Sequence, residues 1–134
     1  MCTRKTLWAF VAALSLAPAC VSQGDPRVPV AVRVEIDYGP ADRAPESSML
    51  LIAKRSTPAD VLQLAAETVQ GYVCCTKDDV FSVNGVEASY SESLYWDWEL
   101  NGQPQELAPD RYHLTNGDRV TWVFREMPLP EHRR

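Results

Sequence analysis

Two segments near the C-terminal end of the chain, residues 95–100 and 119–125, alternate between apolar and polar side chains. Their apolar positions are Trp96, Trp98, Leu100, Val120, Trp122 and Phe124. Because successive side chains of a β-strand point to opposite faces, each set shares one face of its strand. The pattern predicts two amphipathic strands that bury their aromatic side chains against the rest of the protein.

The first part of the folded region has the pattern of a β-hairpin. Residues 30–38 alternate cleanly, and residues 48–54 form a shorter and more continuously apolar run. The segment between them, residues 39–45, contains two prolines and is typical of a loop. We therefore expect two antiparallel strands joined by this loop.

A helix start follows the hairpin. Thr57 is the expected N-cap, and Pro58 is the expected first helical residue. Asp60, three residues after the cap, can complete a capping box with Thr57. Apolar residues then recur on one face of a helix of about three turns. We expect this helix to end before Gly71, with the glycine as its C-cap.

Further turn signals divide the remainder of the chain. Residues 79–83 are predicted to form a strand that ends at the tight-turn dipeptide Asn84-Gly85, and residues 87–93 to form a polar loop. Residues 72–75 are apolar and fit either a strand or the edge of a loop. The resulting order, β-β-α-β-β-β, predicts an α+β domain with a β-grasp-like mixed sheet around one main helix.

Residues 1–20 have the pattern of an export signal peptide. Arg4 and Lys5 precede a short apolar core, and small residues lead to Cys20. A cysteine at the predicted cleavage point resembles a bacterial lipobox, so we favour an exported lipoprotein anchored through Cys20. Simple cleavage to a soluble periplasmic or secreted protein is the alternative. Beyond the signal we predict a flexible tether at residues 21–29, the domain at residues 30–126 and a C-terminal tail at residues 127–134.

The charge balance of the chain argues against nucleic-acid binding. The formal net charge is −5, and removal of residues 1–20, whose charged residues are Arg4 and Lys5, makes it −7. An acidic surface repels phosphate backbones. The length of 134 residues indicates one domain, and an apolar fraction of 46% is that of a folded protein. We expect a small-molecule or protein partner, and membrane contact only through an N-terminal lipid.

Four short motifs follow one another across the predicted domain. They are Thr57-Pro58-Ala59-Asp60-Val61-Leu62, Phe81-Ser82-Val83-Asn84-Gly85-Val86, Tyr95-Trp96-x-Trp98-x-Leu100-Asn101-Gly102 and Tyr112-x-Leu114-x-x-Gly117-Asp118-x-Val120-x-Trp122. Their order and spacing resemble the transcobalamin-like C-terminal domain family, which bacteria carry as an exported domain of largely unknown function. The resemblance covers residues 30–126 and implies a fold similar to β-grasp.

In animal cobalamin carriers this domain is the small β-rich half, which lies over one face of the corrin. The resemblance implies that a flat ligand would be touched by Phe81, Ser82, Val83, Asn84, Tyr95 and Trp98. Cobalamin is therefore the candidate cofactor. Because this chain has no room for the helical barrel that completes the pocket in the carriers, a partner subunit would have to supply it. We expect Trp96 and Trp122 to be core residues, and Trp98 to be the better candidate for a ligand contact.

The adjacent cysteines Cys74 and Cys75 offer a different chemistry. In an oxidising compartment they could form a vicinal disulfide with a redox role, or pair with another chain. Acid pairs at Asp78-Asp79 and Asp97/Glu99 could serve acid–base catalysis. We interpret the acid pairs as solvated strand ends and an outer sheet face.

The sequence offers no convergent nucleophile, base and orienting group. No second Cys or His pair stands at zinc-binding spacing, so no metal is expected, and His113 matches no motif. We therefore predict a non-enzymatic exported module of the cell envelope that binds a ligand or a protein. The ligand would be a planar cofactor such as a corrinoid, held with a partner subunit, or a glycan. The alternative is a small redox-active or hydrolytic envelope enzyme that uses Cys74/Cys75 or the acid pairs.

Overall fold

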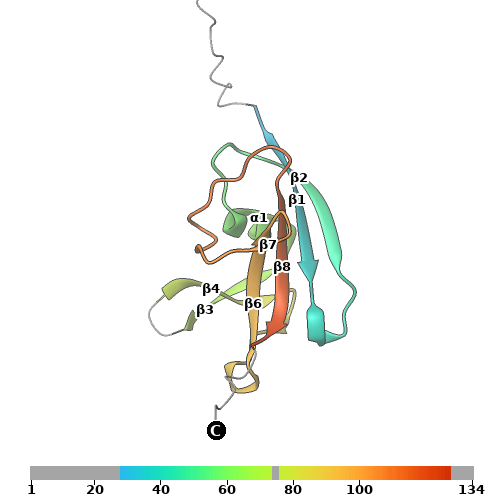
Figure 1. Ribbon diagram of the computed structural model, residues 1–134, viewed down its shortest axis with the longest axis vertical. Coiled ribbons are helices and arrows are strands. Elements are labelled where there is room, and N and C mark those ends of the chain that lie inside the picture. The colour runs from blue at the N-terminus through green and yellow to red at the C-terminus, as the bar shows by residue number, and fades with distance from the viewer. Residues whose placement is uncertain (1–27, 74–75, 128–134) are drawn as a thin grey trace, which may run out of the picture.

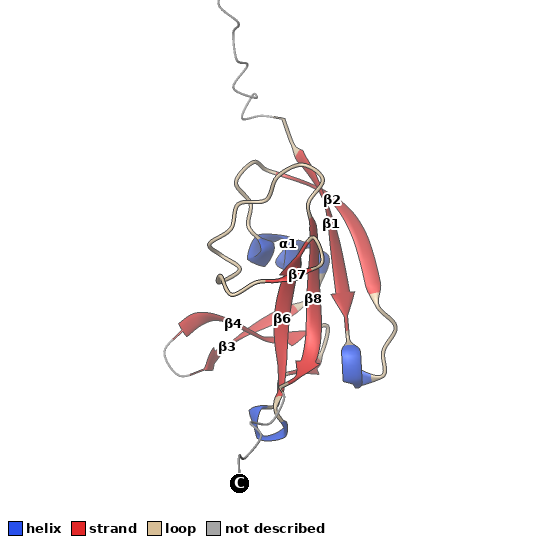
Figure 2. Ribbon diagram, in the orientation of Figure 1, coloured by secondary structure: helices blue, strands red, loops and turns tan. Residues whose placement is uncertain are grey.

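The computed structural model describes residues 28–73 and 76–127. Within them the chain forms mostly strands and one α-helix, an α+β architecture (Figures 1 and 2). The strands are β1 (Val30–Asp37), β2 (Glu46–Ile52), β3 (Thr68–Val73), β4 (Thr76–Val83), β5 (Val86–Glu87), β6 (Leu94–Leu100), β7 (Gln103–Pro104) and β8 (Arg119–Glu126). The helix is α1 (Pro58–Ala65), and two short 3₁₀ turns are η1 (Gly39–Ala41) and η2 (Tyr90–Glu92). In this described part, no helix has the length and apolar character needed to cross a membrane.

Two sheets organise these elements. The larger sheet has the order β2-β1-β8-β6-β7, and the smaller sheet has the order β3-β4-β5. The predicted antiparallel pairing of the first two strands is confirmed. β1 also pairs in parallel with β8, so strands from the two ends of the described chain lie side by side in the larger sheet (Figure 1). β6 continues this sheet as an antiparallel neighbour of β8.

The start of α1 has the capping box that the sequence predicted. Thr57 Oγ1 accepts a hydrogen bond from Asp60 N at 3.2 Å, and Thr57 N donates to Asp60 Oδ2 at 2.8 Å. Pro58 occupies the first turn, where its missing N–H removes no helical hydrogen bond. Val61 and Leu62 are buried, so a short apolar stripe holds the helix in the core.

The helix ends earlier than predicted, and the prediction of Gly71 as its C-cap was wrong. α1 ends at Ala65, Ala66 is the C-cap in an extended conformation, and Gly71 lies within β3. Two hydrogen bonds that periodicity cannot reveal explain the difference. Asn84 N donates to Glu67 O at 2.7 Å, and Glu67 N donates to Asn84 Oδ1 at 2.9 Å. These bonds draw the chain after Ala66 into the smaller sheet.

The described chain also contains more strands than the predicted order. The apolar segment at residues 72–75, which fitted a strand or a loop edge, belongs to β3 up to Val73, and residues 74–75 lie outside the described residues. β5 and β7 were not predicted, because two residues are too few to show an alternating pattern.

Two Asn-Gly dipeptides form hairpin turns, as their composition predicts. Asn84 and Gly85 join β4 to β5 with φ of 48° and 82°, and Asn101 and Gly102 join β6 to β7 with φ of 52° and 81°. Positive φ at both central residues is the requirement of the type I′ turn, whose twist matches that of antiparallel strands. Asn and Gly are the residues that adopt this conformation at least cost.

Aromatic side chains of β6 and β8 fill the core of the domain. Trp96, Trp98, Trp122 and Phe124 are all buried, which confirms the predicted inner face of both strands. Trp96 lies opposite Phe124 with ring centroids 5.0 Å apart, and Trp98 lies opposite Trp122. The ring of Tyr38 meets Trp96 edge-on at 5.9 Å. Burial of each such side chain contributes roughly 2–3 kcal/mol.

A buried carboxylate ties the entry of β8 to the β6–β7 turn. Asp118 accepts hydrogen bonds from Thr115 N at 2.9 Å, Thr115 Oγ1 at 3.1 Å, Asn101 Nδ2 at 3.1 Å and Tyr112 Oη at 3.4 Å. Burial alone raises the pKa of Asp118, but these hydrogen bonds to its charged form outweigh burial and hold the pKa below its ordinary value. Asn101 Oδ1 in turn accepts from Arg119 N at 2.9 Å.

Replacement of Asp118 by alanine should lower the free energy of unfolding by roughly 2–4 kcal/mol, because several donors lose their acceptor at once. Asp110→Ala is the matched control, since the Asp110 carboxylate is partly exposed and contacts Arg111 at 3.7 Å. Chemical denaturation of both variants measures the difference. Equal losses would contradict the anchoring role of Asp118.

The lowered pKa of Asp118 also predicts a dependence of stability on pH. Ionised Asp118 stabilises the fold fully above its unfolded pKa of about 3.9, and this contribution is lost as the pH falls through its lower folded pKa. The thermal midpoint of the natural chain should therefore fall more steeply in acid than that of Asp118→Asn, which has no carboxyl to protonate. Parallel curves below about pH 4 would be the contrary result.

Candidate functional site

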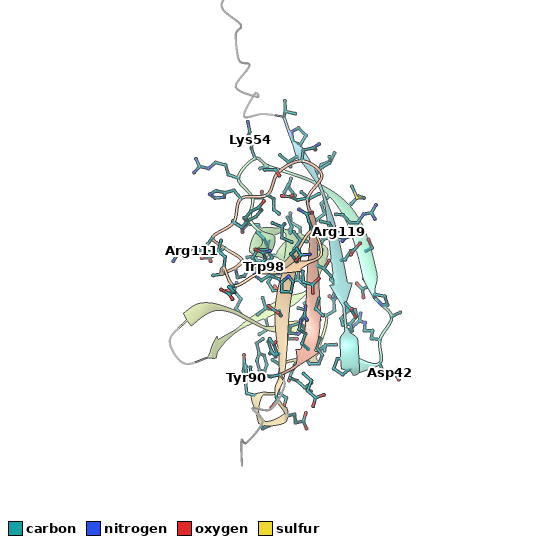
Figure 3. All side chains as sticks on the ribbon, in the orientation of Figure 1. Asp42, Lys54, Tyr90, Trp98, Arg111 and Arg119 are labelled. Carbon is teal, nitrogen blue, oxygen red and sulfur yellow. The ribbon has the colours of Figure 1, made fainter. Side chains whose placement is uncertain are left out.

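A cleft of about 280 Å³ opens beside β6. Buried tryptophans of the larger sheet form one wall, and residues 105–109, which follow β7, form the other. We call this space the aromatic cleft, and Figure 3 labels one of its residues, Trp98. The full lining is Val80, Trp96, Asp97, Trp98, Gln105, Glu106, Leu107, Ala108, Pro109 and Trp122.

Hydrogen bonds hold the outer wall of the aromatic cleft in place. Trp98 Nε1 donates to Leu107 O at 2.9 Å, and Gln105 N donates to Trp98 O at 3.3 Å. At the other end of the wall, Ala59 N of α1 donates to Pro109 O at 3.3 Å. Because the wall is tied both to β6 and to α1, the cleft is preformed.

The three indole N–H groups of the aromatic cleft differ in their hydrogen bonding. Trp96 Nε1 donates to Val86 O at 3.0 Å, and Trp98 Nε1 donates to Leu107 O. Trp122 Nε1 is buried and finds no hydrogen-bond partner among the described residues. A buried donor without an acceptor is unfavourable by about 1–3 kcal/mol, and native proteins contain few of them. The Trp122 side chain lines the aromatic cleft, while its unbonded Nε1 atom is itself covered by the surrounding protein.

The structure separates the six residues that the resemblance implied for ligand contact. Trp98 lines the aromatic cleft and is only 3% exposed, whereas Tyr95 lies on the opposite face of β6. Phe81 is half-buried in β4, and Ser82 and Val83 beside it are buried. Among the described residues that line the cleft, Trp98 is the one member of this set of six. Ligand contact by the set stays a prediction.

Asn84, the sixth residue of that set, connects the two sheets. Its Nδ2 donates to Tyr38 Oη at 2.8 Å and to Glu46 Oε2 at 3.3 Å, while its Oδ1 accepts from Glu67 N. Burial is the largest cause of a raised pKa for Tyr38, so this phenol stays protonated at neutral pH. The Asn84 side chain is thus committed to bonds within the protein.

The other candidate groups also contact protein atoms. The Arg125 guanidinium lies 3.4 Å from Asp97 Oδ2 and also hydrogen-bonds Glu99, so both members of this acid pair on the outer face have the same cationic partner. His113 Nδ1 lies 2.9 Å from Arg55 O. Within the described residues, no group of three His, Cys, Asp or Glu side chains is placed to hold a metal ion. Cys20, Cys74, Cys75 and the side chains of Asp78 and Asp79 lie outside the described residues.

Sequence reasoning missed two parts of the aromatic cleft. Trp122 was expected mainly in the core, because alternation identifies a buried face and gives no account of indole hydrogen bonding. The wall at residues 105–109 was treated as a connection. One sequence signal was present, since Leu107 is a large apolar residue between Pro104 and Pro109.

Residues 59–126 match the model of the family described as Domain of unknown function (DUF4430), which is half of the chain. The chain belongs to the DUF4430 family. No protein among those with curated descriptions matches its sequence. The matched segment contains the helix from its second residue onward, the two Asn-Gly hairpin turns, Asp118 and the complete lining of the aromatic cleft.

Two solved structures share the fold of this DUF4430 protein at low sequence identity. One is a protein from Ruminococcus gnavus ATCC 29149 named as a candidate metal-binding protein, with 17% identity and a TM-score of 0.59 over 73% of this chain and 98% of that one. The other is haptocorrin in complex with Cbi, with 15% identity and a TM-score of 0.58 over 78% of this chain and 28% of haptocorrin. The second likeness agrees with the predicted resemblance to cobalamin carriers at the level of the fold.

The contrast between the indoles predicts a difference in stability. Trp98→Phe should lower the free energy of unfolding by about 1 kcal/mol more than Trp122→Phe, because only the first substitution breaks a hydrogen bond and leaves Leu107 O without its donor. Both substitutions remove the same ring volume, so each serves as the control for the other. Urea denaturation measures both, and a larger loss for Trp122→Phe would show that its N–H has a partner.

Proposed function

We propose that this DUF4430 domain is a non-enzymatic binding module whose aromatic cleft receives the edge of a planar ligand such as a corrinoid. One observation carries the proposal: the buried indole N–H of Trp122 has no partner among the described residues, yet its side chain lines a preformed cleft. The corrin ring is flat and carries amide carbonyl groups at its edge. Such a carbonyl is the kind of acceptor that an unsatisfied indole N–H takes.

The size of the aromatic cleft sets the share of the ligand that it can hold. At about 280 Å³ it is smaller than most complete ligand pockets, which span roughly 300–1,000 Å³. Only part of a corrinoid would enter, and a partner subunit would cover the remainder. The likeness to haptocorrin supports this division, because the chain spans about 28% of that protein.

We further propose that the domain has a β-grasp-like fold and that the protein is exported. A mixed sheet in which β1 lies parallel to β8, with one helix after the first hairpin, favours the β-grasp-like arrangement. Export, with a lipid anchor at Cys20 or simple cleavage, rests on the pattern of residues 1–20. The alternative of a small redox-active or hydrolytic enzyme rests on the acid pairs or on Cys74 and Cys75, which lie outside the described residues.

Equilibrium dialysis of the purified chain against dicyanocobinamide tests the proposal, because the corrinoid is then measured by its own absorbance. We expect weak but saturable binding by the natural chain. Trp122→Phe should weaken it about tenfold, which corresponds to one hydrogen bond of about 1.4 kcal/mol. Trp96→Phe is the matched control, since this residue also lines the cleft but its N–H is already bonded to Val86 O.

The two parts of the proposal fail separately in this experiment. Absence of binding by the natural chain would contradict the corrinoid assignment. Binding that is weakened equally by Trp122→Phe and Trp96→Phe would contradict the role of the unsatisfied N–H. A loss confined to Trp122→Phe, with an unchanged circular dichroism spectrum, supports both parts.

A further inference from the structure

The strand β2 is an open edge of the larger sheet. It pairs with β1 along one side, and in Figures 1 and 2 no other described element runs along its second side. The opposite edge of the same sheet is β7, which has two residues and includes Pro104. A strand of two residues with a proline offers little backbone for further pairing, whereas the seven residues of β2 offer a row of N–H and C=O groups.

After its first residue, Glu46, β2 lacks the features that normally protect an edge. Residues 47–53 contain no charged residue and no proline. Its pairing with β1 runs from Val30 opposite Ile52 to Ile36 opposite Glu46 without a β-bulge. Charges, prolines and bulges are the usual means by which soluble proteins prevent an edge strand from pairing with another chain.

Two large apolar side chains accompany this edge on the outer face of the sheet. Met49 is 63% exposed and Leu51 is 74% exposed. They stand two residues apart and therefore on one face of β2, opposite Arg33 and Ala31 of β1. Apolar residues beside an open row of backbone groups are typical of β-strand addition, in which the backbone supplies hydrogen bonds and alternate side chains supply specificity.

We propose that β2 pairs antiparallel with β2 of a second copy of this chain. With Leu50 opposite the partner's Leu50, Met49 faces the partner's Leu51, and the relation repeats across the twofold axis. Four exposed apolar side chains then cover one another on the outer face. A contact in which one segment is complementary to itself is the requirement for a twofold dimer.

The charges at the two ends of β2 favour the same pairing. Asp42 and Glu46 outnumber Arg43 at one end, and Lys54 and Arg55 follow the other end. Figure 3 labels Asp42 and Lys54 at these opposite ends. In the proposed register the Glu46 backbone lies opposite the partner's Lys54. Because the Glu46 carboxylate already pairs with Arg43 at 2.9 Å, the net charge of −1 at this end is that of Asp42, and this acidic end meets the partner's basic end twice. A parallel arrangement would instead place like charges together, which is unfavourable.

Sedimentation velocity of the purified full chain over roughly a hundredfold range of concentration tests the proposal, because a strand-pairing interface of modest area dissociates on dilution. Reductant is included, so that disulfides at Cys74 or Cys75 cannot produce a dimer. We expect the average mass to rise from monomer to dimer with concentration. The double variant Met49→Lys, Leu51→Lys should remain a monomer, because each new lysine faces the partner's other lysine.

Leu64→Lys is the matched control, since Leu64 lies on α1 and is 67% exposed. It should dimerise like the natural chain. Association driven by the apolar residues 7–16 would persist in the double variant, and that result would overturn the proposal. A natural chain that stays monomeric throughout would overturn it as well. Amide hydrogen exchange gives a second measure: protection of residues 47–51 should rise with concentration, while protection of residues 94–100 stays constant.

Discussion

The burial of the aromatic face shared by β6 and β8 is the constraint on which the rest of the structure depends. Trp96 packs on Phe124 and Tyr38, and Trp98 lies opposite Trp122. Val61 and Leu62 of α1 and Val83 of the smaller sheet belong to the same buried core as these side chains, so both elements help to remove the aromatic face from water. The aromatic cleft lies where this cover meets the wall at residues 105–109.

The motifs that indicated a family resemblance have structural roles. Thr57 and Asp60 cap the helix, Asn84-Gly85 and Asn101-Gly102 form hairpin turns, and Asp118 joins the β6–β7 turn to β8. Each of these residues adopts a backbone conformation, or accepts hydrogen bonds from a set of donors, in a way that few other residue types could. Such motifs specify the fold, and they are compatible with different ligands in different members that share it. The wall of the aromatic cleft, which carries none of these motifs, is where differences in binding would arise.

The candidate site was predictable only in part. Trp98 was expected beside a ligand, and it lines the aromatic cleft, but its indole N–H is occupied by Leu107 O. Trp122, expected mainly in the core, has the unsatisfied donor. Alternation assigns both residues to one face and cannot distinguish them, because the acceptor of an indole comes from a segment distant in sequence. Asn84 was expected beside a ligand as well, and its side chain hydrogen-bonds Tyr38, Glu46 and Glu67 within the protein, while its ligand contact stays a prediction.

The sequence by itself determined the features that arise from local periodicity and local backbone chemistry. These are the inner face of β6 and β8, the first hairpin, the capping box at Thr57 and the Asn-Gly turns. Only the tertiary structure decided where α1 ends, that residues 105–109 wall a cleft, and that β2 remains at an open edge. The end of the helix depends on Asn84, which is 17 residues away from Glu67. Strand order and hydrogen-bond partners are set by contacts between distant segments, and these contacts leave no period in the sequence.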